Sequence, residues 1–427
     1  MEVRLEIEQT RINVEFLPSE EELSSIYSEK MASSLQFSIA ASGPVDFRLV
    51  HDDHLALIIL LAAHPFAKGD LTLPLHVSPL FANACDIFSR YRPVFLSVTN
   101  KPYTPRSTGR PGLAFSGGMD STAALALLPS TTVPVFLDRP HRAKTTLYNK
   151  SAAKATLAFL EAKNIPNISI STDVEFIRNP IGFPTDLASG IPAIALATHF
   201  NFDSIGYGTV MESAYRIGHK KAREYEHSPH YRLWSPLFSS AGIPLILPVA
   251  GVSEIGTSTI VHHSQYRDMA RSCIRGQWPR SCNECWKCFR KQLIDQAIKG
   301  QTMSDEEFKR AMKSKEIASK LSSEFIPHEN VLGWALEKME RGTVLDLLYQ
   351  RLVASTYSLD HLNSFYPNSI NLIPPKYRLH VLEQLRNYLP EMKIEDQKRM
   401  VAQDFSKYVE STEFKSKVID FKKLIKN

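Results

Sequence analysis

From about Gly112 onwards the sequence alternates short apolar runs with longer amphipathic runs, and this pattern limits the possible folds more than any other feature. Short apolar runs bounded by turn residues are typical of buried strands, and the amphipathic runs are typical of helices. The alternation predicts an α/β fold with a parallel sheet and helices on both faces, because parallel strands need a crossover between them. The expected strands are 113–115, 133–137, 168–170, 204–207 and 244–249, and the expected helices are 121–128, 145–163, 187–200 and 257–270.

The regions on either side of this alternation have patterns of their own. Ser19 and Glu22 can form a capping box at a helix start, and the apolar runs at 47–50 and 94–98 are typical of short strands. The basic segment 101–112 is rich in proline and glycine, which is typical of a linker. These features divide the chain into three expected parts: an N-terminal α+β domain (1–108), an α/β domain (109–300) and a C-terminal helical domain (301–427).

Composition excludes several classes of protein. The chain has 427 residues, of which 43% are hydrophobic and 22% charged, so it is neither disordered nor collagen-like. The longest apolar run, around 55–63, is about half of a membrane span, and the N-terminus lacks the pattern of a signal peptide. We therefore expect a cytoplasmic protein that does not contact a membrane. The net charge of +5 permits contact with nucleic acid without arguing for it.

A glycine-rich segment, Ser-Gly-Gly-Met-Asp-Ser at 116–121, lies between the first expected strand of the α/β region and its helix. The first turn of a helix leaves backbone N–H groups unpaired and carries partial positive charge. Gly117 and Gly118 let the backbone approach an anion, and the hydroxyls of Ser116 and Ser121 add donors. The segment predicts a phosphate or pyrophosphate site, although it is neither a Gly-Lys-Ser/Thr loop nor a Gly-x-Gly-x-x-Gly motif. A plain strand-to-helix turn is the alternative.

Four of the five cysteines lie close together near the end of the α/β region, at Cys273, Cys282, Cys285 and Cys288. Four thiolates at these spacings can close a tetrahedral zinc site, and a site with four protein ligands leaves no open position. We therefore predict a structural zinc site. An iron–sulfur cluster, which uses the same ligands, and four unrelated buried cysteines are the alternatives. Cys85 lies outside the cluster and is expected to be a small buried apolar residue.

Together the two motifs resemble those of the PP-loop ATP pyrophosphatase family, and within it those of the 7-cyano-7-deazaguanine synthases (QueC). The segment Ser-Cys-Ile-Arg-Gly at 272–276 resembles that family's Ser-Cys-Tyr-x-Gly, and Ser-Ala-Tyr at 213–215 resembles its Ser-Gly-Tyr substrate loop. The resemblance covers about residues 112–300 and implies a HUP-type (Rossmann-like) sheet. In length and layout the chain resembles the longer QatC-type proteins of bacterial anti-phage systems.

The resemblance implies an enzyme that uses ATP and Mg²⁺ to adenylate 7-carboxy-7-deazaguanine and releases pyrophosphate, after which an amine displaces AMP. The amine would come from ammonia or from a partner protein of the same defence operon. Asp120 and Ser121 are the implied catalytic residues, with Asp120 organising Mg²⁺ or the loop. The residues implied at the nucleotide are Ser116, Gly117, Gly118, Met119, Asp120 and Ser121.

Four further candidates follow from their position in the sequence. Asp138 and Gly206 stand at the carboxyl ends of expected strands, where ligands of such sheets bind, so we expect them near the nucleotide. Tyr215 belongs to the implied substrate loop. The acidic residue of the family pattern is missing after it, and Glu212 is the expected substitute for reading a guanine-like edge.

Two other functions stay open at this point. A tRNA-modifying PP-loop enzyme such as a thiolase would need a reactive cysteine and a strongly basic surface. A nucleotide-binding scaffold subunit of a defence complex would need no chemistry at all. Three basic residues lie beside the cysteine cluster: Lys287, Arg290 and Lys291. They could form a surface for a nucleic acid or a partner, and a solvated face is an equally good interpretation.

Overall fold

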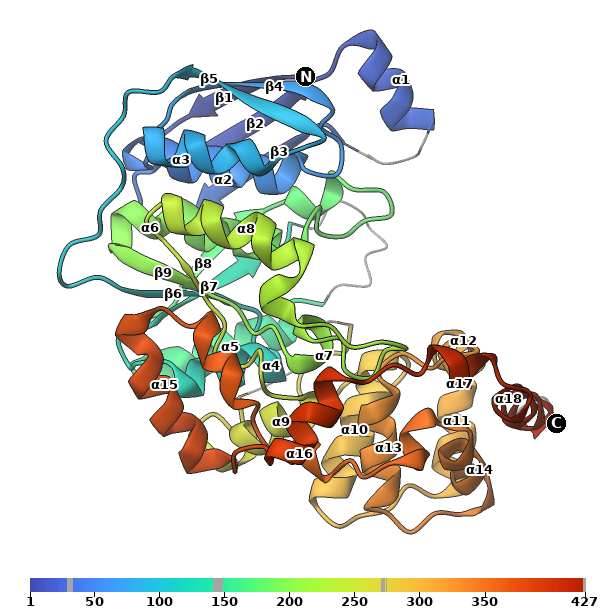
Figure 1. Ribbon diagram of the computed structural model, residues 1–427. Helices are drawn as coiled ribbons and strands as arrows, with labels where there is room; N and C mark the ends of the chain where they lie inside the picture. The colour runs from blue at the N-terminus through green and yellow to red at the C-terminus, as the bar shows by residue number, and fades with distance from the viewer. Residues whose placement is uncertain (29–33, 141–148, 270–272, 274, 425–427) are drawn as a thin grey trace.

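The computed structural model describes residues 1–28, 34–140, 149–269, 273 and 275–424 (Figure 1). The strands within these residues are β1 (Glu2–Ile7), β2 (Arg11–Leu17), β3 (Gln36–Ala41), β4 (Gly69–His76), β5 (Tyr91–Ser97), β6 (Arg110–Phe115), β7 (Val133–Asp138), β8 (Ile168–Thr172), β9 (Phe202–Gly206) and β10 (Leu245–Ile246). They form one mixed sheet in the order β10-β9-β6-β7-β8-β3-β2-β1-β4-β5. The chain is therefore an α/β protein.

The half of the sheet from β10 to β8 is parallel, as the alternation of strands and helices predicted. At β8 the pattern changes, because β8 pairs with β3 in antiparallel orientation, with Thr172 opposite Ile39. β2 is antiparallel to both of its neighbours, β3 and β1. β4 is parallel to β1, and β5 is parallel to β4. The sheet thus continues across residue 108, where the sequence suggested a boundary.

Helices lie on both faces of the parallel strands. Those of the first 300 residues are α1 (Glu20–Ser28), α2 (Asp52–Ala63), α3 (Pro79–Ala84), α4 (Met119–Leu127), α5 (Ser151–Ala162), α6 (Ile191–Phe200), α7 (Met211–Ala214), α8 (Pro229–Ser240), α9 (Glu254–His263) and α10 (Trp286–Ile298). The sheet curls around α2, α3, α6 and α8, while α4, α5 and α9 cover the opposite face of the parallel strands (Figure 1). Eleven of the twelve residues of α2 are buried, so the long apolar run of the sequence is a core helix.

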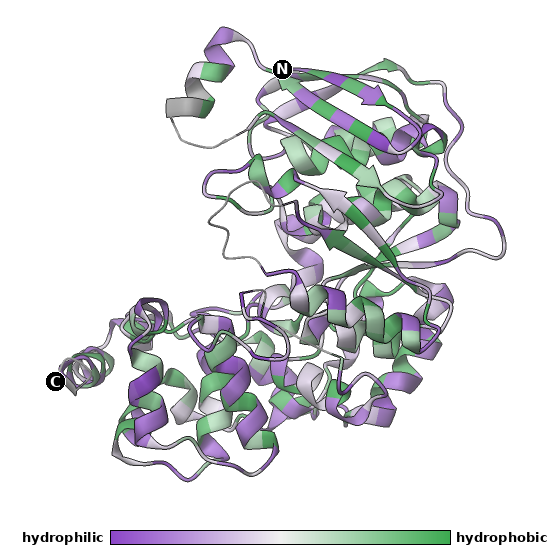
Figure 2. Cartoon of the chain, turned by 180° about the vertical axis from the view of Figure 1, so that it is seen from behind, coloured by the Kyte–Doolittle hydropathy of each residue, from purple (hydrophilic) through white to green (hydrophobic). Residues whose placement is uncertain are grey.

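The N-terminal strands cover the far side of this helical layer. In β2 the side chains of Ile12, Val14 and Phe16 are buried, while the residues between them are more exposed. Seen from behind, these strands show hydrophilic residues among hydrophobic ones (Figure 2). One face of this part of the sheet therefore packs on the core, as is common in antiparallel sheets.

Some expected elements differ from those of the structure. The expected strand at 47–50 is wrong, because Phe47–Leu49 form a 3-10 helix whose first turn is capped by Asp46, with the N–H of Arg48 donating to its carboxylate at 3.1 Å. Ser253 likewise caps α9, so this helix begins three residues earlier than the sequence suggested. The capping box at Ser19 is confirmed.

Three further boundaries were misplaced. β6 already begins at Arg110, within the expected linker, and the expected strand at 244–249 is reduced to Leu245–Ile246. The expected helix at 187–200 starts as a 3-10 helix, Asp186–Gly190, before α6. The first part of the expected helix at 145–163 lies outside the described residues.

Beyond residue 300 the described residues form helices and no named strand, as the sequence predicted. The α-helices are α11 (Asp305–Met312), α12 (Lys315–Leu321), α13 (Glu329–Glu337), α14 (Thr343–Arg351), α15 (Pro375–Tyr388), α16 (Ile394–Val401), α17 (Ser406–Glu410) and α18 (Thr412–Leu424). α12 and α13 pack on α10, and α15 packs on α4 and α9, so these helices contact the α/β region. Across the described part of the chain, no helix has the length and apolarity that spanning a bilayer requires.

Candidate functional site

The glycine loop, residues 116–118, joins the carboxyl end of β6 to the first turn of α4. Gly118 is the N-cap of α4 and offers no capping side chain, so N–H groups of the first turn are left for another acceptor. Gly117 has φ +71°, a conformation that favours glycine. The hydroxyls of Ser116 and Ser121 lie 3.1 Å apart, and Ser121 donates to the carbonyl oxygen of Gly118. Both hydroxyls are thus held beside the free end of the helix.

Gly208, two residues after β9, packs directly against this loop. A β-carbon placed on it would lie 2.7 Å from the backbone nitrogen of Ser121 and 2.8 Å from the carbonyl carbon of Asp120. Because these are backbone atoms, no side chain can be accommodated by a rotamer change. Glycine at this position therefore lets the chain leaving β9 approach the start of α4.

A cavity of about 360 Å³ opens beside the glycine loop, at the carboxyl ends of β6, β7 and β9. Ligands of parallel α/β sheets bind at this edge, and the volume suits a small molecule. The loop and α4 contribute Ser116, Gly118, Asp120 and Ser121 to its wall. The rest of the wall consists of Ala114, Phe115, Phe136, Leu137, Arg139, Phe183, Asp186, Leu187, Ser189, Tyr207, Gly208, Thr209, Ser213, Arg223, Tyr225, His230 and Lys287.

Two of the remaining predicted nucleotide residues lie one position away from this wall. Asp138 pairs with Lys150, with 2.8 Å between carboxylate and ammonium, while both of its sequence neighbours line the cavity. Gly206 ends β9, and the three residues that follow it line the cavity. Gly117 packs on Thr156, whose methyl group would lie 2.9 Å from an added β-carbon. Met119 occupies the first position of α4.

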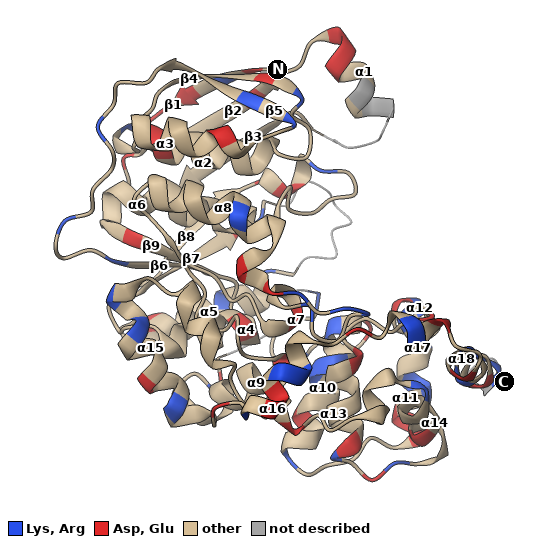
Figure 3. Cartoon of the chain, in the orientation of Figure 1, with Lys and Arg blue, Asp and Glu red and all other residues tan. Residues whose placement is uncertain are grey.

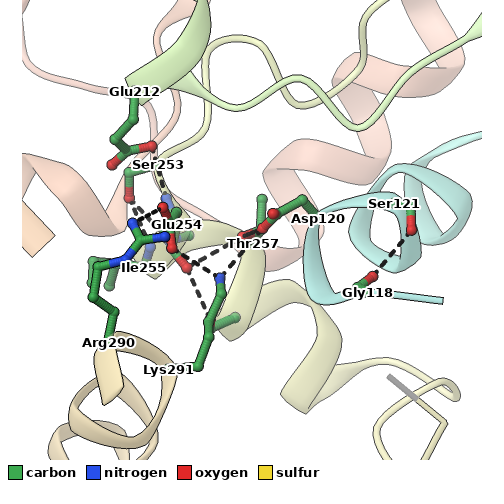
Figure 4. Close-up of polar contacts among 12 residues, drawn as sticks. Gly118, Asp120, Ser121, Glu212, Ser253, Glu254, Ile255, Thr257, Arg290 and Lys291 are labelled. Carbon is green, nitrogen blue, oxygen red and sulfur yellow. Dashed lines mark hydrogen bonds and ion pairs between the residues drawn. The ribbon is translucent and has the colours of Figure 1, made fainter. Parts of the chain in front are cut away.

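Asp120 faces both the cavity and a buried lysine (Figure 4). Its Oδ1 accepts a hydrogen bond of 3.0 Å from the hydroxyl of Thr257 and lies 3.3 Å from Nζ of Lys291. Nζ of Lys291 is also 3.3 Å from Oε2 of Glu254. Burial would lower the pKa of Lys291, but the carboxylates of Asp120 and Glu254 raise it. Lys291 is therefore a charged group held between two anions.

Glu254, at the start of α9, is the centre of this buried cluster (Figure 4). Besides Lys291 it contacts Arg290, at 2.5 Å, and the imidazole Nδ1 of His328, at 3.1 Å. Burial alone would raise the pKa of Glu254, but the cationic Lys291 and Arg290 hold it well below its usual range. Because His328 precedes α13, the cluster connects the glycine loop with the C-terminal helices.

The structure places the two predicted substrate residues behind the wall of the cavity. Glu212 is buried, accepts hydrogen bonds from the N–H of Glu254 and the amide of Asn330, and does not line the cavity. Burial, followed by repulsion from Glu254, raises its pKa to about 8, so it is protonated at neutral pH. Tyr215 is also buried and donates a 2.6 Å hydrogen bond to Glu226.

The four clustered cysteines converge on one point. The Sγ atoms of Cys273, Cys282, Cys285 and Cys288 all lie within 4.8 Å of one another, and those of Cys282 and Cys288 are 3.7 Å apart. A tetrahedral zinc ion with bonds of about 2.3 Å requires sulfur atoms about 3.8 Å apart. Cys273 also accepts N–H donors from Gly276 and Cys282, which favour a thiolate. The cysteines are close enough to hold one metal ion, which is compatible with zinc and contradicts unrelated buried cysteines.

The cysteine cluster and the cavity meet at α10. Cys285 is the N-cap of this helix, and its sulfur accepts the N–H of Cys288 in the first turn. Between these two ligand candidates lies Lys287, which reaches the cavity wall. One turn further on, α10 presents Arg290 and Lys291 to Glu254 and Asp120.

A solvated face is therefore the wrong interpretation for two of the three basic residues. The side chains of Arg290 and Lys291 are only 8% and 11% exposed, and both are paired. The pairing could not be read from the sequence, since Asp120 precedes Lys291 by 171 residues. The available signal was their spacing from Lys287, because residues three and four apart share one helix face.

Comparison with known proteins gives one partial match. The model of a family described as "Family of unknown function (DUF6395)" matches residues 233–404. No curated protein and no solved structure was found to match the chain. The matched segment contains the four cysteines and α10 but not the glycine loop, and its description names no activity.

Proposed function

We propose that the chain is an ATP-dependent adenylating enzyme of the PP-loop type, which activates the carboxylate of 7-carboxy-7-deazaguanine for attack by an amine. The observation that carries this proposal is the cavity at the carboxyl ends of the parallel strands, with the Ser-Gly-Gly-Met-Asp-Ser loop in its wall. The strand order β10-β9-β6-β7-β8 supports a HUP-type sheet, because the loop follows the central strand where the order reverses.

In this proposal the glycine loop binds the pyrophosphate portion of ATP. Free N–H groups of α4 supply donors, the hydroxyl of Ser121 holds the loop through Ser116 and Gly118, and the helix N-terminus favours the negative charge. The adenosine portion lies toward the end of β7, where Phe136 and Leu137 offer apolar surface. Because Thr257 and Lys291 occupy Oδ1 of Asp120, its Oδ2 is the candidate ligand for Mg²⁺, which would neutralise phosphate charge.

In the proposed adenylation, residues of the chain stabilise the negative charge that develops on the phosphate groups. A carboxylate oxygen of the substrate bonds to the α-phosphorus of ATP, and the bond from this phosphorus to the bridging oxygen breaks. Pyrophosphate leaves with the electron pair, and the loop donors stabilise its developing charge. An amine nitrogen then bonds to the activated carbonyl carbon, loses a proton, and AMP leaves. Ammonia gives an amide by this route, which a second activation would convert to a nitrile, and an amine of a partner protein gives a conjugate.

A thiolating enzyme acting on tRNA has less support. The wall of the cavity contains no cysteine among the described residues, and Cys85 is buried elsewhere in the core. Acidic and basic residues are interspersed along the elements that Figure 3 draws, and the net charge is only +5. Neither a reactive thiol in the described wall nor a strong net positive charge therefore supports this alternative.

The test is a reaction of the purified chain with ATP, Mg²⁺ and 7-carboxy-7-deazaguanine, with and without ammonia and proteins of the same operon. We expect AMP on chromatography, together with an amide or nitrile, or a mass gain on a partner protein, in mass spectrometry. Ser121→Ala should lower AMP formation about 100-fold, because it removes the hydroxyl that holds Ser116 and Gly118 of the loop in position. Ser416→Ala, an exposed serine of α18, is the control. Absence of AMP under every condition would contradict adenylation and favour a nucleotide-binding scaffold.

A further inference from the structure

The wall of the cavity offers few free positive charges to an anionic ligand. Arg139 is paired with Glu175 at 2.7 Å, and the guanidinium of Arg223 donates to two backbone carbonyl oxygens of α7. Lys291 lies behind Asp120, between two carboxylates. Lys287 also lines the cavity, and its ammonium has no hydrogen bond or ion pair within the part of the chain that the structure describes. Arg223 keeps its charge but uses two of its donors on these carbonyl oxygens, whereas the donors of Lys287 are free for a phosphate group within the described residues.

The position of Lys287 depends on the start of α10. The lysine lies between Cys285, which caps this helix, and Cys288, which lies in its first turn. A metal ion bound to both sulfur atoms would hold the backbone on either side of the lysine. Without the ion, no bond ties the sulfur atoms of Cys285 and Cys288 to a common point, and the turn loses this constraint. The far end of the same turn stays tied by Arg290 and Lys291.

We infer that Lys287 binds the pyrophosphate portion of ATP, and that a metal ion in the four-cysteine site keeps it in position through α10. The metal ion would then do more than stabilise the loop that carries the cysteines. It would also fix the position of the positive charge of Lys287 at the phosphate end of the cavity. The identity of the anion rests on the proposed function, whereas the assignment of Lys287 and its coupling to the metal go beyond it.

The first part of the inference is tested by binding, without catalysis. Calorimetry with inorganic pyrophosphate and Mg²⁺ compares the metal-loaded wild-type chain with Lys287→Gln, Lys287→Arg and Lys299→Gln. Removing one charge-assisted contact is expected to weaken binding about 10-fold in Lys287→Gln, while the arginine variant keeps most of the affinity. Lys299 caps the other end of α10, so its variant should bind as the wild type does. Equal affinities for Lys287→Gln and the wild type would overturn the assignment.

The second part is tested by removing the metal from the wild type and from Lys287→Gln. Metal analysis reports the loss of the ion, and circular dichroism reports whether the chain stays folded. Metal loss should weaken pyrophosphate binding about 10-fold in the wild type and hardly at all in Lys287→Gln, since the affected contact is already missing. Equal losses in both chains would overturn the coupling. If the metal-free chain unfolds, Cys282→Ser, which keeps three ligands, provides the same comparison.

The outcomes separate this inference from the proposed function. Pyrophosphate binding that depends on Lys287, in a chain that forms no AMP with 7-carboxy-7-deazaguanine, would support the inference and contradict the enzyme. AMP formation by a chain in which Lys287→Gln changes no affinity would support the enzyme and overturn the inference.

Discussion

At the scale of the residue, the loop depends on positions where a side chain cannot be added. Gly208 lies so close to the backbone of Ser121 that a β-carbon would force the two segments apart. Gly208→Ala is therefore expected to weaken the binding of a non-hydrolysable ATP analogue at least about 10-fold. Gly43→Ala, where a β-carbon meets nothing within 4 Å, is the matched control. Calorimetry measures both, and an unchanged affinity in Gly208→Ala would contradict the close packing.

A second prediction at this scale concerns the proton on Glu212. Its pKa rises from 4.5 in the unfolded chain to about 8 in the folded chain, so the unfolded state loses its proton first as the pH increases. The group therefore destabilises the fold progressively between these two pH values, by at most about 1.4 kcal/mol per pH unit. Glu254 is ionised in both states over this window and adds no slope.

Glu212→Gln removes this titration. The free energy of unfolding of the variant, minus that of the wild type, is expected to increase from about pH 5 to about pH 8 and then to level off. Urea unfolding at a series of pH values measures the difference. Glu224→Gln, which changes an exposed carboxyl group, is the control. A flat difference in Glu212→Gln would show that Glu212 is ionised in the folded chain.

The sequence predicted which side chains come together at the site where those residues are close together in the chain. Ser116, Gly118 and Ser121 meet at the cavity because one loop carries them all. The contact of Lys291 with Asp120 was not predictable, because packing of α10 beside α4 and α9 brings together residues far apart in the chain. Glu212 lies outside the cavity wall because it is buried, and no local pattern reports burial.

At the scale of the element, α10 joins the four-cysteine cluster to the rest of the site. We expect one zinc ion per chain, measured by elemental analysis of protein purified without added metal. Cys285→Ser should lose the ion and lower the melting temperature, because it removes a metal ligand while the serine can still cap α10. Cys85→Ala lies outside the cluster and should keep the full metal content. Full metal content in Cys285→Ser, or iron with sulfide in the wild type, would contradict a four-cysteine zinc site.

Helices and strands were predicted best where the spacing of apolar residues and the length of the run indicated the same kind of element. β7 lies where the sequence placed it, because a strand buried on both faces leaves a continuous apolar run. β9, which contains Asp203 and Ser204, begins two residues before the expected strand and ends one residue before its end. The run at 47–50 failed because four apolar or basic residues cannot distinguish a strand from a 3-10 turn, and the side chain of Asp46 favours the turn.

At the scale of the whole molecule, the sheet and α2 join the first hundred residues to the α/β region. β3 extends the sheet from β8, and the apolar helix α2 packs on α6. The expected boundary at residue 108 was inferred from composition, which does not report how strands pair. A chain reduced to 109–427 would expose the edge of β8 and the apolar surface of α6, and we expect it to aggregate or to lack a cooperative unfolding transition.

Size-exclusion chromatography and thermal unfolding of 109–427 test this expectation against the intact chain. A monomeric 109–427 with a cooperative transition would show that this part folds without residues 1–108, which agrees with the boundary that the sequence suggested.

Exchange of labelled pyrophosphate into ATP tests most directly whether the chain transfers AMP from ATP to a carboxylate. Adenylation is reversible before the amine attacks, so the account predicts label in ATP only when 7-carboxy-7-deazaguanine and Mg²⁺ are both present. Ser121→Ala should slow this exchange about 100-fold, and Ser416→Ala should leave it unchanged. Release of ADP and phosphate without exchange, or no exchange with the substrate present, would contradict the account.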